Sequence, residues 1–295
     1  MLVIHKHIYI FVCIILPLIT IAQNNQLQYN LNNPQQTLIL PPIIHEISGI
    51  TMIDSNTVAC VQDEMGIVFI YNLKDQKISK ELTFGPNGDY EGITKVNQSL
   101  YVLRSDGVVF EIEDYQAKKI SVKTIHTGIT AENNEGLCYD PSKHRLLIGA
   151  KGRINKEPNN KNIRLIYELD LNTKKLKTTP IYTFQLPDIN TQAKQLNYPF
   201  NTHQTKKGKV IEKGLRFNTS EIALHPITGH LYVLSASDYC LMILAHLGEL
   251  IHIEKLNPNL FRKAEGMSFL DNGTLFISNE GKTDKPTLLR FQHTP

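Results

Sequence analysis

Five short segments of this chain resemble one another and recur at a nearly constant interval. Each begins a strand-like run, and most carry an acidic residue, a glycine and an aliphatic residue in succession. The copies are Glu46-Ile-Ser-Gly-Ile50, Asp89-Tyr-Glu-Gly-Ile93, Asn133-Asn-Glu-Gly-Leu137, Asn218-Thr-Ser-Glu-Ile222 and Lys263-Ala-Glu-Gly-Met267. Aligned on their third residues, they lie 43, 44, 85 and 45 residues apart. An interval of about 40–45 residues with strand-like content is typical of a β-propeller with one copy per blade.

The sequence between two copies predicts four short strands separated by turn-rich segments. In the first blade the expected strands are 49–53, 57–62, 67–73 and 78–84. The last repeat offers only three such runs before the chain stops. The apolar run 36–40 would supply the fourth strand and so close the ring without an open edge. We therefore predict an all-β fold, a single β-propeller of five four-stranded blades.

The first 22 residues have the pattern of a secretory signal peptide. A weakly basic start precedes the almost wholly apolar run 8–21, and Thr20 and Ala22 suit cleavage after Ala22. The apolar run of about 14 residues is short for a membrane span of about 20, although an uncleaved anchor is the alternative. We expect an exported protein, located in the periplasm, at the cell surface or outside the cell, whose propeller domain spans 23–295.

Composition excludes some classes of partner. The formal net charge of +3 is spread through the sequence, and no DNA- or RNA-reading motif is present, so nucleic acid is not an expected partner. The cysteines that follow the signal segment, Cys60, Cys138 and Cys240, are odd in number and lie in apolar runs. They predict buried free thiols and not a disulfide framework.

One stretch, 187–219, breaks the repeat and accounts for the interval of 85 residues. It is polar, without clean alternation, and is either a degenerate blade or a long insertion, which we favour. Because it starts where an outer strand crosses to the next inner strand, we expect it to lie over the same face as the repeats. There Tyr198, Phe200 and His203 would form part of a lid or partner surface, or else a disordered loop.

Acidic residues fall at positions that a propeller gathers onto one mouth of its channel. The crossings from outer to inner strands share a face with the turns between second and third strands. The crossings contribute Glu46, Asp89, Glu91, Glu135, Glu221 and Glu265, and the turns contribute Asp63, Glu64, Asp106, Asp238 and Glu280. Carboxylates this close repel one another unless a cation lies among them, and calcium takes six to eight oxygen ligands. Alternatively, each Glu-Gly pair is structural, with the carboxylate capping a tight turn and glycine supplying a positive φ.

With these residues in view, the chain resembles the SdiA-regulated, or YjiK-like, family of secreted bacterial proteins. The resemblance is carried by Glu46-Ile-Ser-Gly-Ile50, Asp63-Glu64, Asp89-Tyr-Glu-Gly-Ile93, Asn134-Glu-Gly-Leu137 with Asp140, and Ala264-Glu-Gly-Met267 followed by Ser278-Asn-Glu280. It covers the chain after the signal segment and implies a five-bladed propeller with a calcium site. Carried over motif by motif, it makes these residues the candidate ligands: Asp63, Glu64, Asp89, Glu91, Glu135 and Glu265. The chain departs from the pattern at Glu221, where glycine is expected, and at the long insertion.

These features lead to three functional hypotheses. The first is an exported calcium-binding propeller, a monomer that binds a glycan, peptide or small molecule at the cell envelope. The second is a calcium-dependent hydrolase of phosphoesters, esters or lactones that uses the acidic mouth, although no catalytic residue can be named. A third is a scaffold in which the acidic ring only holds the fold together. A metal with open positions beside a cleft would favour the hydrolase.

Overall fold

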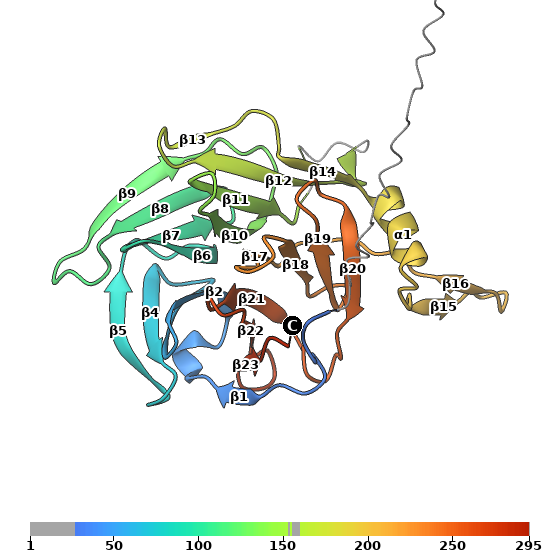
Figure 1. Ribbon diagram of the computed structural model, residues 1–295, viewed down its shortest axis with the longest axis horizontal. Helices are drawn as coiled ribbons and strands as arrows, with labels where there is room; N and C mark the ends of the chain where they lie inside the picture. The colour runs from blue at the N-terminus through green and yellow to red at the C-terminus, as the bar shows by residue number, and fades with distance from the viewer. Residues whose placement is uncertain (1–26, 153, 155–159, 295) are drawn as a thin grey trace, which may run out of the picture.

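In the computed structural model, which describes residues 27–152, 154 and 160–294, five antiparallel sheets radiate like spokes around a central channel (Figure 1). The all-β fold and the five-bladed propeller are therefore confirmed. The predicted signal peptide, residues 1–22, lies outside the described residues. Among the residues that are described, no helix is long and apolar enough to cross a membrane.

Each blade begins with the strand nearest the channel and continues outward. The first blade contains β2 (Ile47–Asp54), β3 (Thr57–Gln62), β4 (Ile67–Asn72) and β5 (Lys77–Thr83). The second contains β6 (Tyr90–Val96), β7 (Ser99–Arg104), β8 (Val108–Glu113) and β9 (Ser121–His126). The fourth contains β17 (Glu221–Leu224), β18 (Leu231–Ser235), β19 (Cys240–Leu244) and β20 (Leu250–Lys255).

The third blade differs at its outer edge. It contains β10 (Asn134–Asp140), β11 (Arg145–Ala150) and β12 (Ile163–Asp170), followed by β13 (Lys175–Leu176) and β14 (Tyr182–Gln185). Both of the last two pair with β12. The sequence predicted one strand, 176–184, but Pro180 lies between the two pieces and cannot donate a hydrogen bond to a sheet.

The fifth blade joins the two ends of the chain. It contains β21 (Ala264–Phe269), β22 (Leu275–Asn279), β23 (Thr287–Phe291) and, outermost, β1 (Gln36–Ile39). β1 runs antiparallel to β23, with Thr37 opposite Leu289. The predicted closure by an N-terminal strand is confirmed, and it removes the open edge that β23 would otherwise present. A short 3-10 turn, Pro42–Ile44, then leads into β2.

Hydrophobic side chains fill the spaces between blades. Within the described residues, five buried clusters each lie at one junction between neighbouring blades. At the first junction, for example, Val61 and Val68 of one blade pack with Leu100 and Val102 of the next. Cys60, Cys138 and Cys240 lie in such clusters as buried free thiols, as predicted.

The repeated glycines let the inner strands approach one another. A Cβ atom on Gly49 would lie 2.9 Å from the Cα of Gly92, and one on Gly92 would lie 2.8 Å from the backbone oxygen of Glu135. The suggestion that these glycines supply a positive φ is wrong, because the positive φ values of the described chain occur at other residues. Close packing around the channel, and not turn geometry, requires a residue without a side chain here.

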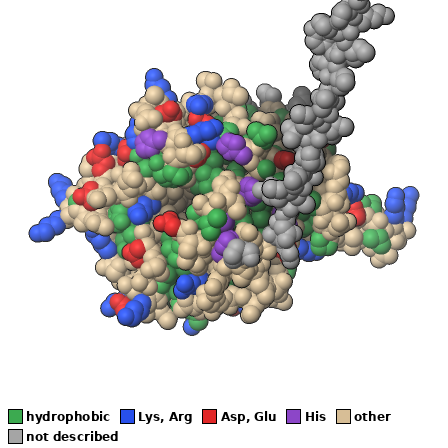
Figure 2. All heavy atoms as spheres, in the orientation of Figure 1, with side chains coloured by type: hydrophobic (Ala, Val, Ile, Leu, Met, Phe, Trp, Pro, Cys, Tyr) green, Lys and Arg blue, Asp and Glu red, His purple; other side chains and the backbone are tan. Residues whose placement is uncertain are grey.

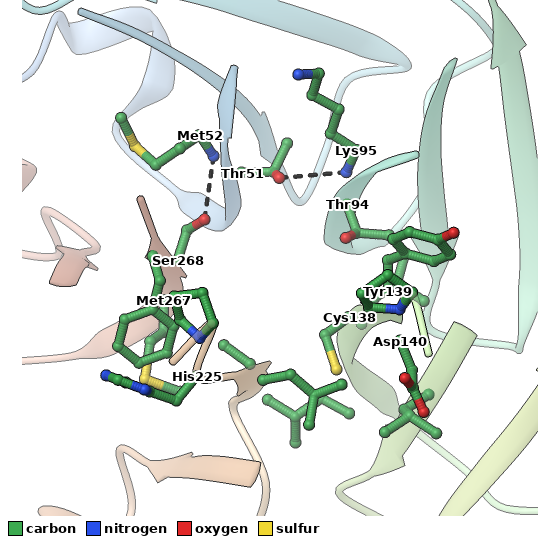
Figure 3. Close-up of a pocket in the computed structure, with 18 of the residues that line it drawn as sticks. Thr51, Met52, Thr94, Lys95, Cys138, Tyr139, Asp140, His225, Met267 and Ser268 are labelled. Carbon is green, nitrogen blue, oxygen red and sulfur yellow. Dashed lines mark hydrogen bonds between the residues drawn. The ribbon is translucent and has the colours of Figure 1, made fainter. Parts of the chain in front are cut away.

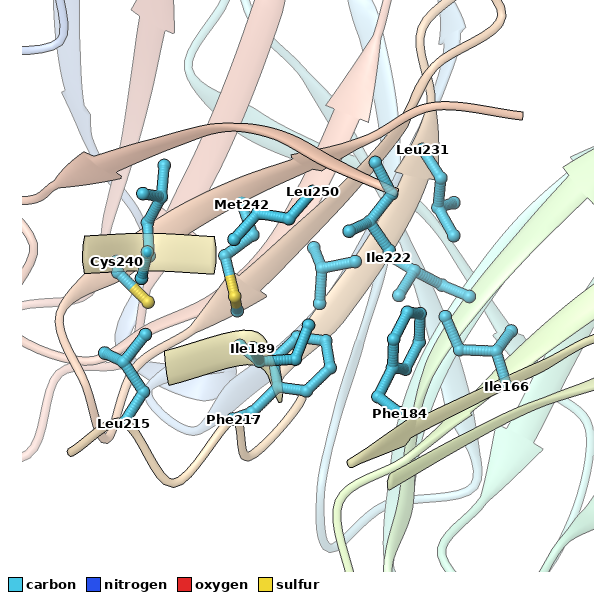
Figure 4. Packing of buried hydrophobic residues seen from close by; sticks show 14 of the residues in the cluster. Ile166, Phe184, Ile189, Leu215, Phe217, Ile222, Leu231, Cys240, Met242 and Leu250 are labelled. Carbon is cyan, nitrogen blue, oxygen red and sulfur yellow. The ribbon is translucent and has the colours of Figure 1, made fainter. Parts of the chain in front are cut away.

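The segment 187–219 is an insertion that folds against the outside of the wheel. It begins with α1 (Leu186–Gln195) and continues with the hairpin of β15 (Thr202–Gln204) and β16 (Val210–Glu212). α1 lies beside β14 and β20 at the rim of Figure 1, and not over the channel as expected. α1 lies there because one of its faces is apolar. On that face Ile189 and Ala193 are buried with Phe217, Met242 and Leu250 (Figure 4).

Tyr198 is buried on this outer cluster, with Phe200 packed against it, whereas His203 is exposed on the hairpin. The last residues of the insertion return to the blades. There the carboxylate of Asp238 accepts hydrogen bonds from the amides of Arg216 (3.1 Å) and Phe217 (2.8 Å). Asp238 therefore anchors the insertion.

A buried histidine fixes the N-terminal segment to the fourth and fifth blades. The hydroxyl of Tyr29 donates to the carbonyl of Gly273 (2.6 Å) and lies 2.8 Å from Nε2 of His225. Nδ1 of His225 accepts hydrogen bonds from the amides of Ile227 (3.3 Å) and Thr228 (3.1 Å). These contacts require a neutral imidazole with its proton on Nε2.

The pKa of His225 should make the fold sensitive to acid. Burial, and then the neighbouring His293 and His230, lower this pKa to about 4. The unfolded chain therefore binds a proton below about pH 6.5 that the folded chain excludes, so stability falls as the pH drops. We expect the loss in free energy of unfolding between pH 6.5 and pH 4 to be up to about 3 kcal/mol smaller in His225→Asn. Urea unfolding across this range measures it, with the exposed His246→Asn as the control that should leave the slope unchanged.

Candidate functional site

The inner strands begin at one end of the channel, and there the sequence motif takes a specific shape. In four blades the aligned residue, Ser48, Glu91, Glu135 or Glu265, is the extra residue of a β-bulge between the first two strands. A bulge re-aims the side chain of its extra residue. The recurrence of Glu-Gly thus has a structural cause, and the bulges also turn three glutamates toward one another.

The structure brings three of the sequence-predicted ligands, Glu91, Glu135 and Glu265, to the centre of this end. Burial raises the pKa of Glu91 to about 9, reinforced by repulsion from Glu135, Asp89 and Glu265. Burial also raises the pKa of Glu135 to about 8, although Lys151, 2.6 Å away, opposes the change. We call this end of the channel, with Glu91, Glu135, Glu221 and Glu265 at its centre, the acidic mouth.

The other three candidates, Asp63, Glu64 and Asp89, lie together at the rim of the acidic mouth. Burial, followed by repulsion from Glu46, raises the pKa of Asp63 to about 6, with Lys263 acting in the opposite direction. Glu64 and Asp89 are exposed. The rim therefore adds negative charge around the mouth.

The three remaining carboxylates from the list of turns have other partners. Asp106 forms a two-pronged ion pair with Arg104 (2.8 and 2.9 Å), and Asp238 holds the insertion as described above. Glu280 pairs with Lys263, which also lies 3.4 Å from Glu265. Lys151 and Lys263 are thus the cations that face the central carboxylates.

Glu221 is the central carboxylate whose place the sequence left uncertain. It stands where the other blades have glycine, and its side chain is fully buried. Its Oε1 accepts hydrogen bonds from the amides of Leu137 (2.8 Å) and Ile222 (2.9 Å). Burial raises its pKa well above the usual value, and Glu135 and Glu265 raise it further. The substitution itself was the signal, because a side chain at this position must enter the channel.

Several buried oxygens at the acidic mouth accept no hydrogen bond. Among the described residues, the carboxylate and amide oxygens in this state are Asp63 Oδ1, Asn134 Oδ1, Glu221 Oε2 and Asn279 Oδ1. All four belong to residues at the start of inner strands or at the end of second strands, which share this face. Buried polar atoms in native proteins nearly always have a partner, so several unpaired acceptors on one face indicate missing cations or waters there.

The donor set fits a hard cation. Carboxylate and amide oxygens are the ligands that calcium prefers, and the raised pKa values of Glu91, Glu135 and Glu221 show that the described lysines do not offset the cost of ionising these carboxylates. No three His, Cys, Asp or Glu side chains in the described part of the chain are close enough to hold a metal together as they stand. Calcium binding would therefore require the central side chains to move inward, away from Lys151 and Lys263.

An apolar layer closes the channel just beyond the acidic mouth. It is formed by the residue that follows the repeat glycine, or Glu221, in each blade, and every member is at most 2% exposed. The members are Ile50, Ile93, Leu137, Ile222 and Met267. On the far side of this layer a cavity of about 1000 Å³ opens at the opposite end of the channel (Figure 3). On that face, hydrophobic and histidine side chains gather around the centre of the wheel (Figure 2).

Five blades around a plugged channel, with carboxylates at one end and a cavity at the other, define a β-propeller protein with an acidic mouth. The chain belongs to the SdiA-regulated family, whose model matches residues 24–283.

Comparison with solved structures gives the following similarities. The glutaminyl cyclase of Myxococcus xanthus is 13% identical, with a TM-score of 0.57 over 88% of this chain and 95% of that one. A chain of a nidogen/laminin complex is 12% identical, with a TM-score of 0.49 over 80% of this chain and 73% of that one. At such identities the cyclase likeness shows the fold alone. The search among curated proteins found no match.

Proposed function

We propose that this protein is an exported, calcium-binding β-propeller that acts as a binding module at the cell envelope. The observation that carries the proposal is the presence of buried, unpaired oxygens and four carboxylates at one face of the wheel, where the described residues contribute two lysines, Lys151 and Lys263. Glu91, Glu135, Glu221 and Glu265 would hold the cation. It would supply the positive charge that these side chains lack.

The rim residues have a supporting role in this proposal. Asp63, Glu64 and Asp89 place negative charge together at one side of the rim, which raises the local concentration of cations. Oδ1 of Asn134, next to Glu135, is a neutral oxygen available to the same cation. The proposed ligands come from four different blades, so the cation would join segments that are far apart in the sequence.

The position of the apolar layer favours a binding module over a hydrolase. A catalytic calcium needs an open position that faces a substrate pocket. Here Ile50, Ile93, Leu137, Ile222 and Met267 separate the acidic mouth from the large cavity. A cation at the mouth would be enclosed by blades and would stabilise the ring.

Calcium should raise the melting temperature of the purified protein. At free calcium 100 times the dissociation constant, the free energy of unfolding should rise by about 2.7 kcal/mol, because only the folded chain assembles the site. For a chain of this size that corresponds to about 5 °C or more. Thermal melts in chelator and in millimolar calcium, with metal analysis of the protein, measure it. Equal melting temperatures and no bound metal would contradict the proposal.

A further inference from the structure

The cavity at the end of the channel opposite the acidic mouth has the size of a ligand site. Its volume is about 1000 Å³, and the apolar layer forms its floor. Pockets for small molecules have volumes of about 300–1000 Å³ and mostly apolar walls. We call this cavity the channel pit.

The channel pit exists because five inner-strand residues are all small. They follow the apolar layer by one position and are Thr51, Thr94, Cys138, Ala223 and Ser268. The first four are 6–7% exposed, whereas the apolar layer beneath them is at most 2% exposed. A large side chain at any of these positions would fill part of the space, so the pit depends on a small residue at this position in every blade.

Three of these small side chains cap a backbone amide of the next blade. Each capped amide belongs to the residue that follows the small residue of the next blade, and Figure 3 shows two of these caps, Ser268 with Met52 and Thr51 with Lys95. The pairs are Ser268 with Met52 (3.1 Å), Thr51 with Lys95 (3.2 Å) and Cys138 with Leu224. At three of the five junctions, a hydroxyl or thiol thus accepts a hydrogen bond from a backbone N–H group that would otherwise point into the pit.

Two junctions between described residues lack this cap: at the junction of the second and third blades Thr94 carries a hydroxyl but does not bond the amide of Tyr139, and at the junction of the fourth and fifth blades no side chain could form the bond. Ala223 has no acceptor to offer the amide of Phe269. The amide of Leu270 donates to the carbonyl of Thr274 (2.9 Å), on the side of β22. Amides of neighbouring residues in a strand point to opposite sides, so the amide of Phe269 points toward the channel. The N–H group of Phe269 is therefore a hydrogen-bond donor in the wall of the pit. It lacks the side-chain acceptor that the amides of Met52, Lys95 and Leu224 have.

The rest of the wall suits a flat, uncharged molecule. It contains Met52, Met267 and Tyr139 together with the imidazole of His225, both of whose nitrogens already have partners. The inner charged groups are also engaged. The ammonium group of Lys95 donates to the carbonyl of Ile53 (3.1 Å), and Asp140 is paired with Arg145 (2.8 Å).

We infer that the channel pit binds a small uncharged molecule with a flat apolar body and one carbonyl group, whose oxygen accepts the hydrogen bond of the Phe269 amide. The apolar body packs on the floor and against the sulfur and aromatic groups of the wall. This inference deepens the proposed binding function and rests on it, but the pit needs no calcium at the acidic mouth.

A matched pair of probes tests the carbonyl. 2-Acetylnaphthalene and 2-isopropenylnaphthalene have nearly the same shape, but only the first has an acceptor. Displacement of the fluorescent N-phenyl-1-naphthylamine from the purified chain gives their affinities. We expect the ketone to bind about fivefold more tightly, the effect of one net hydrogen bond. Ala223→Ser supplies the missing cap and should abolish this preference, whereas Ala117→Ser on an outer loop should keep it.

Methyl NMR of methionines locates the probe. The ketone should shift the signals of Met52 and Met267, which line the pit, and leave Met65 and Met242 unchanged, since these lie elsewhere. Failure of both probes to bind, shifts confined to Met65 or Met242, or an undiminished preference in Ala223→Ser would each overturn the inference. The calcium-dependent melting temperature of the same sample reports separately on the acidic mouth.

Discussion

Replacing Arg145 with methionine should lower the free energy of unfolding by about 3–5 kcal/mol. The guanidinium group is 3% exposed and lies between Asp140 (2.8 Å) and Glu168, which are also buried. Burial alone would raise the pKa of both acids. Hydrogen bonds from Ser142 and Arg145 hold the pKa of Asp140 below its usual value. Hydrogen bonds from Lys177 and Arg145 do the same for the pKa of Glu168. Methionine would fill the volume and leave the carboxylates without their main partner. Urea unfolding at neutral pH measures the loss.

Two further variants show whether charge or packing causes that loss. Arg104→Met breaks an ion pair with Asp106 that is largely exposed, so it should cost less than about 1 kcal/mol. Adding Glu168→Gln to Arg145→Met removes one of the stranded charges and should restore part of the stability. An Arg145→Met variant no less stable than Arg104→Met would show that the buried network contributes little.

Glu221→Gln should have opposite effects on stability with and without calcium. In chelator the variant should be more stable by about 1–3 kcal/mol, because an amide avoids the cost of burying a carboxylate beside Glu135 and Glu265. Its side-chain oxygen would still accept the amides of Leu137 and Ile222. In calcium the order should reverse, because the variant lacks the central anionic ligand. Melting temperatures of both proteins in both buffers measure this.

The matched control for this test is Glu249→Gln, an exposed acid in the same blade but on a turn at the opposite face. It should change neither the melting temperature in chelator nor the calcium effect. An identical calcium shift in Glu221→Gln and in the natural protein would remove Glu221 from the proposed site, and would leave open the part played by the other three glutamates.

Sequence analysis predicted the fold well because a propeller repeats one short motif at a regular interval, once in each blade. Glu91, Glu135 and Glu265 were placed at one end because each begins an equivalent strand, and the closing strand 36–40 matched β1 for a similar reason. α1 was missed, since Ile189 and Ala193 are its only buried residues in a polar stretch. Its apolar face is visible only once the neighbouring blades are in place.

The channel pit was missed for a different reason. Its space depends on Thr51, Thr94, Cys138, Ala223 and Ser268 all being small, and none of these residues is unusual alone. For Glu221 the sequence did give a signal, an acid where the other blades have glycine, but the burial of its side chain and its bonds to Leu137 and Ile222 became visible only in the structure. Both the pit and the surroundings of Glu221 depend on contacts between neighbouring blades, which a single sequence does not reveal.

The pairing of β1 with β23 also has a consequence for folding order. The two strands that complete the wheel come from opposite ends of the chain, so a growing polypeptide stays an open arc until its last strand has been made. Contacts this distant in sequence form slowly, because a very long loop must close first. By its own topology, a chain of this design therefore remains an incompletely closed arc until β23 has been synthesised.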